Sequence, residues 1–299
     1  MRTWDSKSVG SAWQHAFFYL LIRILGRRIA YGFMYVVILW YILFSPLLHQ
    51  RCRPYLSRRF PKAGQLSMLW YKFRWISALG KTLIDRAAYG ILGEHTIHID
   101  VPDGPMLAEL LKEGKGLIIV SAHTGCWQIA FSALRFFATS VHIVMHRDYS
   151  DIDRQFYEHK NATPPFEIID PADYLGGTLR MISVLQDGGV LGLMGDRVFG
   201  NETNTVAVDF LGEKVDFPVA AYRLAAMRGT PIAVLFSYKE SFMHYHVQIA
   251  GIMRLPTGVN RNSHAYMPYV QEYARYLQNF VDKYPFDFYN FHQMWRSVK

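Results

Sequence analysis

The stretch Gly116-Leu-Ile-Ile-Val-Ser-Ala-His-Thr-Gly-Cys-Trp-Gln128 predicts a buried apolar strand that leads into a histidine, a glycine turn and the start of a helix. His123 would then lie at the carboxyl end of a strand, which is where open α/β sheets bind their ligands. It would also face the N-terminus of the next helix, whose positive dipole end disfavours the imidazolium and keeps the ring neutral. A neutral imidazole in that position is a candidate general base.

The rest of the chain alternates between the signals of strands and those of helices. Short apolar or alternating runs predict strands at residues 95–101, 117–122, 141–145, 166–169, 190–194, 205–210, 231–238 and 244–249. Helical spacing predicts helices at residues 66–92, 106–112, 127–137, 150–160, 177–186, 219–227 and 267–284. Strands separated by helices of about ten residues indicate an α/β fold with a mostly parallel central sheet flanked by helices.

The N-terminal residues differ in composition from the remainder of the chain. Residues 29–48 carry no charge, and twenty residues are enough for a helix to cross a hydrocarbon core of about 30 Å. Lys and Arg flank this run on both sides, so the charges give no orientation. We weigh a transmembrane helix, a hairpin held in one leaflet and a buried core helix, and we favour contact with a membrane. We therefore expect a membrane-anchoring helical segment at residues 1–50 and an α/β domain at residues 51–299, with the first 90 residues forming a helical layer that docks on the membrane.

The chain is apolar for a soluble enzyme and basic, with 51% hydrophobic residues, 19% charged residues and a net charge of +8. The positive charge is concentrated in a span that contains one acid, Asp85. The basic residues of that span are Arg51, Arg53, Arg58, Arg59, Lys62, Lys72, Arg74, Lys81 and Arg86. A basic cluster beside apolar segments indicates an anionic membrane surface or an acidic partner. We expect no nucleic acid as a partner, because the sequence has no helix-turn-helix, zinc-finger or RNA-binding aromatic motif.

The cysteines and histidines lack the spacing of a disulfide framework or a metal site. Cys52 and Cys126 are the only cysteines, and we interpret Cys126 as a small residue packed at a turn rather than as a nucleophile. No His-Glu-x-x-His spacing occurs, and His142 and His146 have no third ligand candidate nearby. We expect neither a metal nor another cofactor. Reduced cysteines and the lack of a cleavable signal peptide indicate a catalytic face in the cytoplasm.

A second block, Gly192-Leu-Met-Gly-Asp196-Arg197, also leaves a buried strand. If this strand runs parallel to the one before His123, Asp196 lies at the same sheet edge and can orient the imidazole. Arg197 can then bind a phosphate or a carboxylate. The alternative is an internal ion pair between Asp196 and Arg197 that fixes a loop.

Two further blocks are less specific when each is taken alone. Residues 209–218 (DFLGEKVDFP) precede a helix that carries Arg223, and Phe217-Pro218 gives that helix a rigid entry. Apolar walls of this kind suit an acyl chain, although by itself the block predicts only a hairpin that feeds a helix. Residues 284–295 (YPFDFYNFHQMW) are rich in aromatic side chains, which either line a lipid groove or fill the core.

Together, in this order and spacing, the four blocks resemble the late lipid A acyltransferase branch of the lysophospholipid acyltransferase superfamily, and most of all the predicted bacterial acyltransferases related to that branch. The resemblance covers nearly the whole chain, including Leu83-Ile-Asp85-Arg86. It implies a glycerolipid acyltransferase-like fold on the cytoplasmic face of a bacterial inner membrane, either membrane-associated or single-pass. It also implies transfer of a fatty acyl group from an acyl carrier protein or coenzyme A thioester to a hydroxyl or amine of a membrane lipid. Acyl carrier proteins are acidic, which agrees with the net charge of +8.

In the enzymes that this chain resembles, a His-x4-Asp/Glu pair acts as the base, which places the base at His123. The helix-start amides from Gly125 to Trp127 would hold the oxyanion. Arg197 and Arg147 would bind the anionic head group of the acceptor or the phosphopantetheine of the donor. The remaining residues expected at the substrate are Gly195, Phe217, Pro218 and Arg223.

Position 128, where that pattern has a carboxylate, is glutamine. Gln128 can accept a hydrogen bond from the imidazole, but it carries no charge to stabilise the imidazolium, a loss that costs the serine protease triad orders of magnitude. Three interpretations stay open. Asp196 supplies the missing charge, which we favour, or His123 works with Gln128 alone, slowly or on an easier acceptor. In the third, the chain is an inactive lipid-binding relative, or carries a deliberately introduced glutamine of nearly the same shape.

Overall fold

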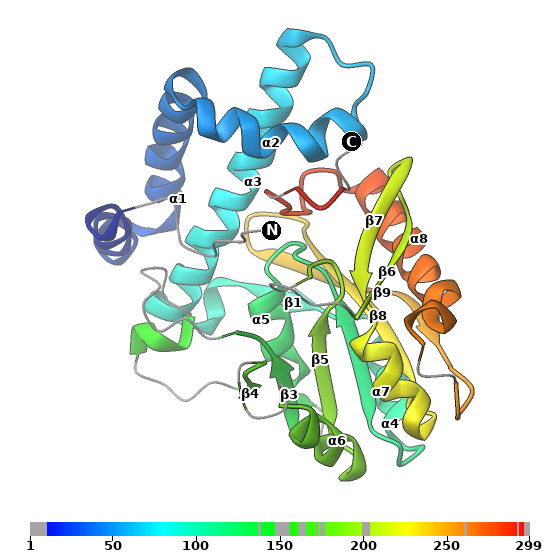
Figure 1. Ribbon diagram of the computed structural model, residues 1–299. Helices are drawn as coiled ribbons and strands as arrows, with labels where there is room; N and C mark the ends of the chain where they lie inside the picture. The colour runs from blue at the N-terminus through cyan, green and yellow to red at the C-terminus, as the bar shows by residue number, and fades with distance from the viewer. Residues whose placement is uncertain are drawn as a thin grey trace.

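The computed structural model describes residues 11–136, 139–146, 156–160, 166–171, 173, 177–198, 204–259, 262–291 and 293–295. Within these residues a seven-stranded sheet has the strand order β1-β9-β8-β2-β5-β3-β4, and a separate hairpin joins β6 to β7 (Figure 1). The strands are β1 (His98–Asp100), β2 (Leu117–Ser121), β3 (Val141–Val144), β4 (Glu167–Ile169), β5 (Val190–Met194), β6 (Thr205–Phe210), β7 (Glu213–Pro218), β8 (Ile232–Lys239) and β9 (His244–Met253).

Most neighbouring strands of the large sheet run parallel, as the sequence predicts. β2 pairs in parallel with β5 and with β8, and β3 pairs in parallel with β4 and with β5. β9 returns antiparallel to β8 through a hairpin, and β1 pairs in parallel with β9. All five residues of β2 are buried, which is the pattern of a strand covered on both faces.

Helices cover both faces of the sheet, because successive side chains of each strand point to opposite sides. Ile119 and Leu235 face the core under α4 (Gly104–Leu111) and α5 (Trp127–Ser132), which continues as the 3₁₀ turn η2 (Ala133–Phe136). Val120 and Phe236 face the opposite core, under α6 (Thr178–Gln186), α7 (Ala220–Arg228), α8 (Met267–Lys283) and the β6–β7 hairpin. Three further 3₁₀ turns are η1 (Glu94–Thr96), η3 (Phe156–Lys160) and η5 (Ser263–Tyr266).

Three helices precede the sheet: α1 (Ala12–Phe44), α2 (Pro46–Arg59) and α3 (Gln65–Leu92). α1 packs along α3 (Figure 1) and is interrupted at Gly26, whose φ of 77° lies outside the helical region. Ser45 ends α1, and Pro46 begins α2. The uncharged run of residues 29–48 therefore covers the C-terminal part of α1 and the start of α2. The domain boundary expected at residue 50 falls inside α2.

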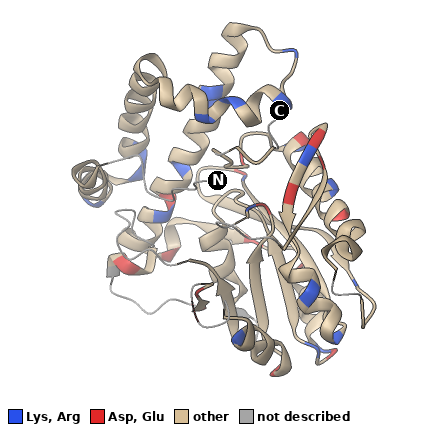
Figure 2. Ribbon diagram, in the orientation of Figure 1, with Lys and Arg blue, Asp and Glu red and all other residues tan. Residues whose placement is uncertain are grey.

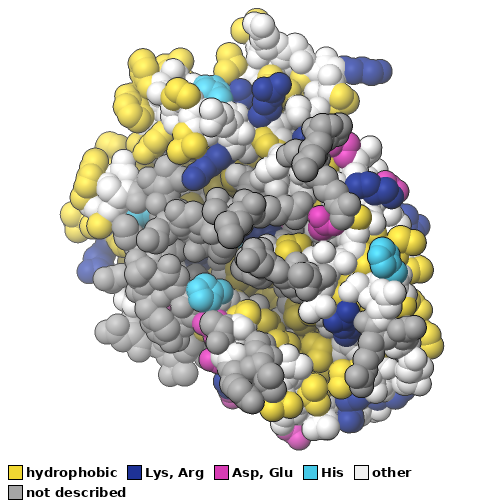
Figure 3. All heavy atoms as spheres, viewed as in Figure 1, with side chains coloured by type: hydrophobic (Ala, Val, Ile, Leu, Met, Phe, Trp, Pro, Cys, Tyr) yellow, Lys and Arg dark blue, Asp and Glu magenta, His cyan; other side chains and the backbone are white. Residues whose placement is uncertain are grey.

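The face of α1 that points away from α3 is apolar and exposed, and Figure 3 shows hydrophobic side chains gathered along it. Among the described residues, α1 is the one helix that is long and apolar enough to cross a membrane, and 33% of its most apolar window is buried inside the protein. A large exposed apolar patch marks a surface that contacts a membrane or another protein. Its exposed side chains are Trp13, Phe17, Leu20, Ile24, Leu25, Ile29, Phe33, Val36, Leu39, Trp40, Leu43 and Phe44.

The basic span between residues 51 and 86 is partly used inside the protein. Figure 2 marks Lys and Arg positions along α2. Arg58 binds Glu213 at 2.7 Å, and Arg86 is buried. The exposed members of the span are Arg53, Lys62 and Arg74. Part of the predicted basic surface is thus available to an anionic partner.

Gly192 lets α5 approach the sheet closely, and this contact can be tested. A Cβ at Gly192 would lie 2.5 Å from the Phe131 ring, so we expect Gly192→Ala to lower the free energy of unfolding by about 1–3 kcal/mol through overpacking. Denaturant unfolding of the detergent-solubilised protein measures the change. Gly32→Ala is the control, because nothing lies within 4 Å of its added Cβ. Equal stability of the Gly192 variant and the wild type would contradict this account of the packing.

Candidate active site

The register between β2 and β5 brings His123 and Asp196 together. Ser121 lies opposite Met194, and His123 and Asp196 each follow two residues after that pair. Both carboxylate oxygens of Asp196 lie 3.0 Å from His123 Nδ1, and the His123 backbone N–H donates to Oδ2 at 3.2 Å. The Asp196 side chain is fully buried, and the His123 side chain is 18% exposed. The structure thus shows the juxtaposition that the sequence predicts for parallel strands.

The surroundings keep His123 neutral and Asp196 ionised. Burial, and then the nearby positive charge of Arg197, lower the pKa of His123 below its usual value, although Asp196 raises it. Burial raises the pKa of Asp196, but His123 and Arg197 outweigh burial and lower that pKa to about 2. An ionised Asp196 accepts the hydrogen bond, so His123 Nδ1 carries the proton and Nε2 keeps its lone pair. The pair is therefore poised as a base at neutral pH.

Gln128 does not take part in this pair. It lies in the first turn of α5 and is partly exposed, and no hydrogen bond joins it to His123 in the described part of the chain. In the described part of the chain, His123 Nδ1 instead forms its hydrogen bond with Asp196. Of the two partners that the sequence offers for the imidazole, the structure therefore brings Asp196 into contact.

The C-terminal segment of residues 284–295, which we call the strap, fixes the loop that carries His123. Thr124 forms an antiparallel bridge with Phe288. The Gly125 backbone N–H donates to the Asp287 carbonyl at 2.9 Å, and the Tyr289 N–H donates to the His123 carbonyl at 2.8 Å. The expected role of the Gly125 amide in an oxyanion hole is therefore wrong for this conformation, because that N–H already has a partner.

Gly125 is required by close packing as well as by backbone conformation. Its φ is +47°, and a Cβ there would lie 2.5 Å from the Ser237 carbonyl oxygen. Ser237 in turn donates its hydroxyl to the Thr124 carbonyl at 2.8 Å, and its N–H donates to the Thr124 hydroxyl at 3.2 Å. On the opposite side, the Tyr273 hydroxyl donates to the Ser121 carbonyl at 3.0 Å. The sequence alone assigns no role to Ser237 or Tyr273, because they lie on β8 and α8, far along the chain.

Gly195 and Arg197 hold the same region from the β5 side. The Gly195 N–H donates to the Ser121 carbonyl at 2.8 Å, and a Cβ on Gly195 would lie 2.7 Å from Val120 and 2.8 Å from Tyr273. The Arg197 guanidinium donates to the Tyr289 carbonyl at 2.7 Å and has Nε 3.9 Å from Asp196. These contacts match the internal role that the sequence left open for Arg197, and they make Gly195 a packing residue.

Phe217, Pro218 and Arg223, which the sequence also places at the substrate, have their own contacts in the described structure. Phe217 is fully buried and packs on Tyr273, so it fills the core instead of lining a substrate surface. Pro218 ends β7 opposite Thr205. The Arg223 guanidinium binds the Asn204 and Ser263 side chains. Arg147 lies outside the described residues.

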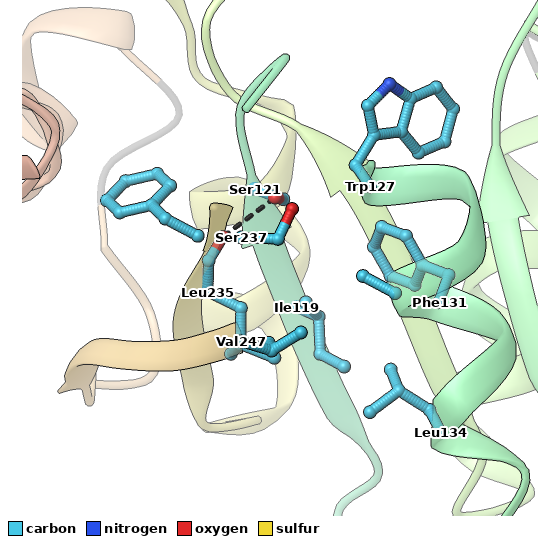
Figure 4. A pocket seen from close by; sticks show the side chains of 10 residues that line it. Ile119, Ser121, Trp127, Phe131, Leu134, Leu235, Ser237 and Val247 are labelled. Atoms are coloured by element: carbon cyan, nitrogen blue, oxygen red, sulfur yellow. Dashed lines mark hydrogen bonds between the residues drawn. The ribbon is translucent and has the colours of Figure 1, made fainter. Parts of the chain in front are cut away.

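A narrow apolar pocket opens beside Trp127 (Figure 4). Its cavity volume is about 20 Å³, room for roughly one water molecule. Trp127, Phe131 and Leu134 line one wall, and the strands β2, β8 and β9 supply the other. The Trp127 ring centroid lies 6.0 Å from that of His123. The pocket is thus a small apolar cavity, and Trp127, which lines it, also lies next to the His123 ring.

Comparison with known protein families decides the class of the chain. The family described as bacterial lipid A biosynthesis acyltransferase matches residues 79–297. The chain belongs to this family. With its mostly parallel sheet it is an acyltransferase of the α/β class. Its structure is similar to that of the 1-acyl-sn-glycerophosphate acyltransferase PlsC from Thermotoga maritima, at 12% identity over 87% of this chain and 98% of that one, with a TM-score of 0.38. No curated protein matches the chain.

The electrostatics of this acyltransferase site predict a low protonation midpoint for His123. In a ¹⁵N-histidine NMR titration, the His123 signal, assigned with His123→Ala, should titrate below pH 6.5. Asp196→Asn should move the midpoint still lower, because the Asp196 charge raises the His123 pKa. A wild-type midpoint at or above 6.5 would show that burial and Arg197 do not control the ring.

Proposed function

We propose that this acyltransferase moves a fatty acyl group from an acyl carrier protein or coenzyme A thioester to a hydroxyl or amine of a membrane lipid, with His123 as the general base. The observation that carries the proposal is the 3.0 Å contact between His123 Nδ1 and a buried, ionised Asp196. It supplies the charge that Gln128 lacks. The resemblance of the motifs to the late lipid A branch supports a membrane lipid as the acceptor.

The reaction follows from the positions of the two imidazole nitrogens. Nε2 takes the proton from the acceptor hydroxyl or amine as its oxygen or nitrogen attacks the thioester carbonyl. Asp196 stabilises the imidazolium that forms. The tetrahedral intermediate then collapses, the carbon–sulfur bond breaks, and the thiolate takes the proton back from Nε2. Attack on a thioester needs no metal in this scheme.

The backbone amides of Cys126 and Trp127 are the donors that suit the oxyanion. Neither N–H has a hydrogen-bond partner among the described residues, and both precede or begin α5 beside His123. Preorganised donors of this kind stabilise the charge that develops on the carbonyl oxygen. They replace the Gly125 amide, which is bound to the strap.

The exposed apolar face of α1 supports a position on a membrane, where both the acceptor and the acyl chain reside. Because one side of α1 packs on α3, the helix presents only its other side to lipid. This arrangement favours a helix that lies in one leaflet of the membrane. The neighbouring exposed basic residues suit the anionic cytoplasmic face of the inner membrane.

Acyl transfer from a radiolabelled acyl carrier protein thioester into total membrane lipid tests the proposal. His123→Ala should abolish transfer, and Asp196→Asn should lower kcat about 10²- to 10⁴-fold, by analogy with loss of the charged member of a catalytic triad. Gln128→Glu should not raise kcat, because Nδ1 already has its carboxylate.

The variants also separate the alternatives. Loss of transfer in His123→Ala with normal transfer in Asp196→Asn would leave Gln128 as the partner and overturn the assignment of Asp196. A wild type that binds lipid vesicles but transfers nothing, from either the carrier-protein or the coenzyme A thioester, would make the chain a lipid-binding relative. Recovery of transfer in Gln128→Glu would then identify a dormant enzyme.

A further inference from the structure

Asp85 of α3 is a buried carboxylate that accepts hydrogen bonds from three other elements. Arg27 Nη1 donates to Oδ1 at 3.1 Å, and the Tyr31 hydroxyl donates to the same oxygen; both residues lie on α1. Lys239 Nζ of β8 donates to Oδ2 at 2.5 Å, and the Tyr245 hydroxyl of β9 donates to it at 2.7 Å. Asp85 is 0% exposed, so the carboxylate is enclosed by these four groups. A carboxylate has about four acceptor sites, and the cluster fills them.

The residues around Asp85 also contact Phe242, which lies in the turn between β8 and β9. The Arg27 guanidinium lies over the Phe242 ring, 3.9 Å from its centroid, and Tyr31 packs edge-on against the same ring. Lys239 also donates to the Phe242 carbonyl at 3.2 Å. Burial lowers the pKa of Lys239, and Asp85 counteracts that effect. Removing Asp85 would leave two buried cations uncompensated, and removing Arg27 or the Tyr31 hydroxyl leaves an acceptor site of the buried carboxylate unfilled, so in each case the neighbours must move.

Lys239 connects this cluster to the strap through its main chain. Its backbone N–H donates to Asp287 Oδ1 at 3.2 Å. The Asp287 carbonyl accepts the Gly125 N–H at 2.9 Å, two residues from His123. Tyr289, two residues further along the strap, donates its N–H to the His123 carbonyl. A contiguous series of hydrogen bonds thus runs from α1 to the loop that carries the base.

We propose that Asp85 is a positioning residue that ties α1 to the His123 loop, so that α1 sets the geometry of the catalytic site in addition to offering an apolar face to the membrane. The inference rests on the proposed acyltransferase function. Arg27 and Tyr31 are buried on the side of α1 that faces the protein, whereas the apolar side chains of its other side are exposed. The two functions of α1 are therefore carried by different side chains and can be separated by substitution.

Variants of Arg27 and Tyr31 test the coupling without altering the exposed face. We expect Arg27→Met to lower kcat ~100-fold and Tyr31→Phe to lower it ~10-fold, because small displacements of a catalytic group cost rate on this scale. KM for the acyl thioester should change little. Arg27→Lys keeps the cation but loses the guanidinium that stacks on Phe242, so its kcat should lie between those of Arg27→Met and the wild type. Binding to vesicles of phosphatidylethanolamine and phosphatidylglycerol should be unchanged in all three.

Arg23→Met is the matched control, because it removes the same charge from an exposed position of the same helix, away from Asp85. Its kcat should equal that of the wild type. An Arg27→Met variant no slower than Arg23→Met would overturn the inference. So would a loss of rate that follows a parallel loss of vesicle binding, since α1 would then act only as an anchor. If Arg27→Met fails to fold, the kcat of Tyr31→Phe and of Arg27→Lys decides.

A spectroscopic readout separates failure of this inference from failure of the proposed function. The ¹⁵N-histidine NMR signals of His123 report the ring's environment whether or not the protein transfers acyl groups. If the wild type is inactive, a shifted His123 signal or midpoint in Tyr31→Phe, absent from Arg23→Met, still supports the coupling. An unchanged His123 signal in Tyr31→Phe overturns it, even where the wild type is active.

Discussion

The parallel pairing of β2 with β5 is the contact on which the site depends. Side chains alternate between the faces of a sheet, so a slip of one residue in this register would turn His123 and Asp196 away from each other. Two observations show how the register is held beyond the strand ends. The Gly195 N–H donates to the Ser121 carbonyl, and only a glycine at position 195 leaves room for Val120 and Tyr273. The relative position of His123 and Asp196 is thus set mainly by backbone pairing.

The pairing of β2 with β5 buries ionisable groups such as Asp196. Hydrogen bonds and nearby charges must offset the free energy that these groups lose when they leave water. Asp196 stays ionised because it accepts hydrogen bonds from His123 and lies near the Arg197 guanidinium. Arg197 is in turn held by the Tyr289 carbonyl of the strap. The same strap holds Gly125, so a single segment contacts both Arg197 and the loop that carries His123. Positioning by a second layer of contacts keeps a catalytic group within the small tolerance that rate requires.

The sequence predicts those parts of the fold and site that depend on local patterns. The strands before His123 and Asp196 are short buried runs that end at polar residues, and parallel strands necessarily bring those ends together. The strap escapes prediction, because Thr124 and Phe288 pair across more than 160 positions and the aromatic run also suits a core. The break at Ser45 is carried by the sequence itself, because a serine followed by proline is a usual start for a new helix and Ser45-Pro46 interrupts the uncharged run. The sequence analysis places Phe217 at the substrate, whereas the structure buries it in the core. A phenylalanine in the core and one that lines a groove give the same sequence pattern.

Glutamine at position 128 is consistent with the charge balance of this site. Asp196 and Arg197 together leave the surroundings of His123 close to neutral, which suits an imidazole that must start unprotonated. A second carboxylate in the first turn of α5 would add a further negative charge, and a negative charge close to an imidazole raises its pKa. Nδ1 has one proton to donate, and Asp196 already accepts it. With the carboxylate supplied from the end of β5, a neutral side chain on α5 is consistent with the proposed role of His123 as a base.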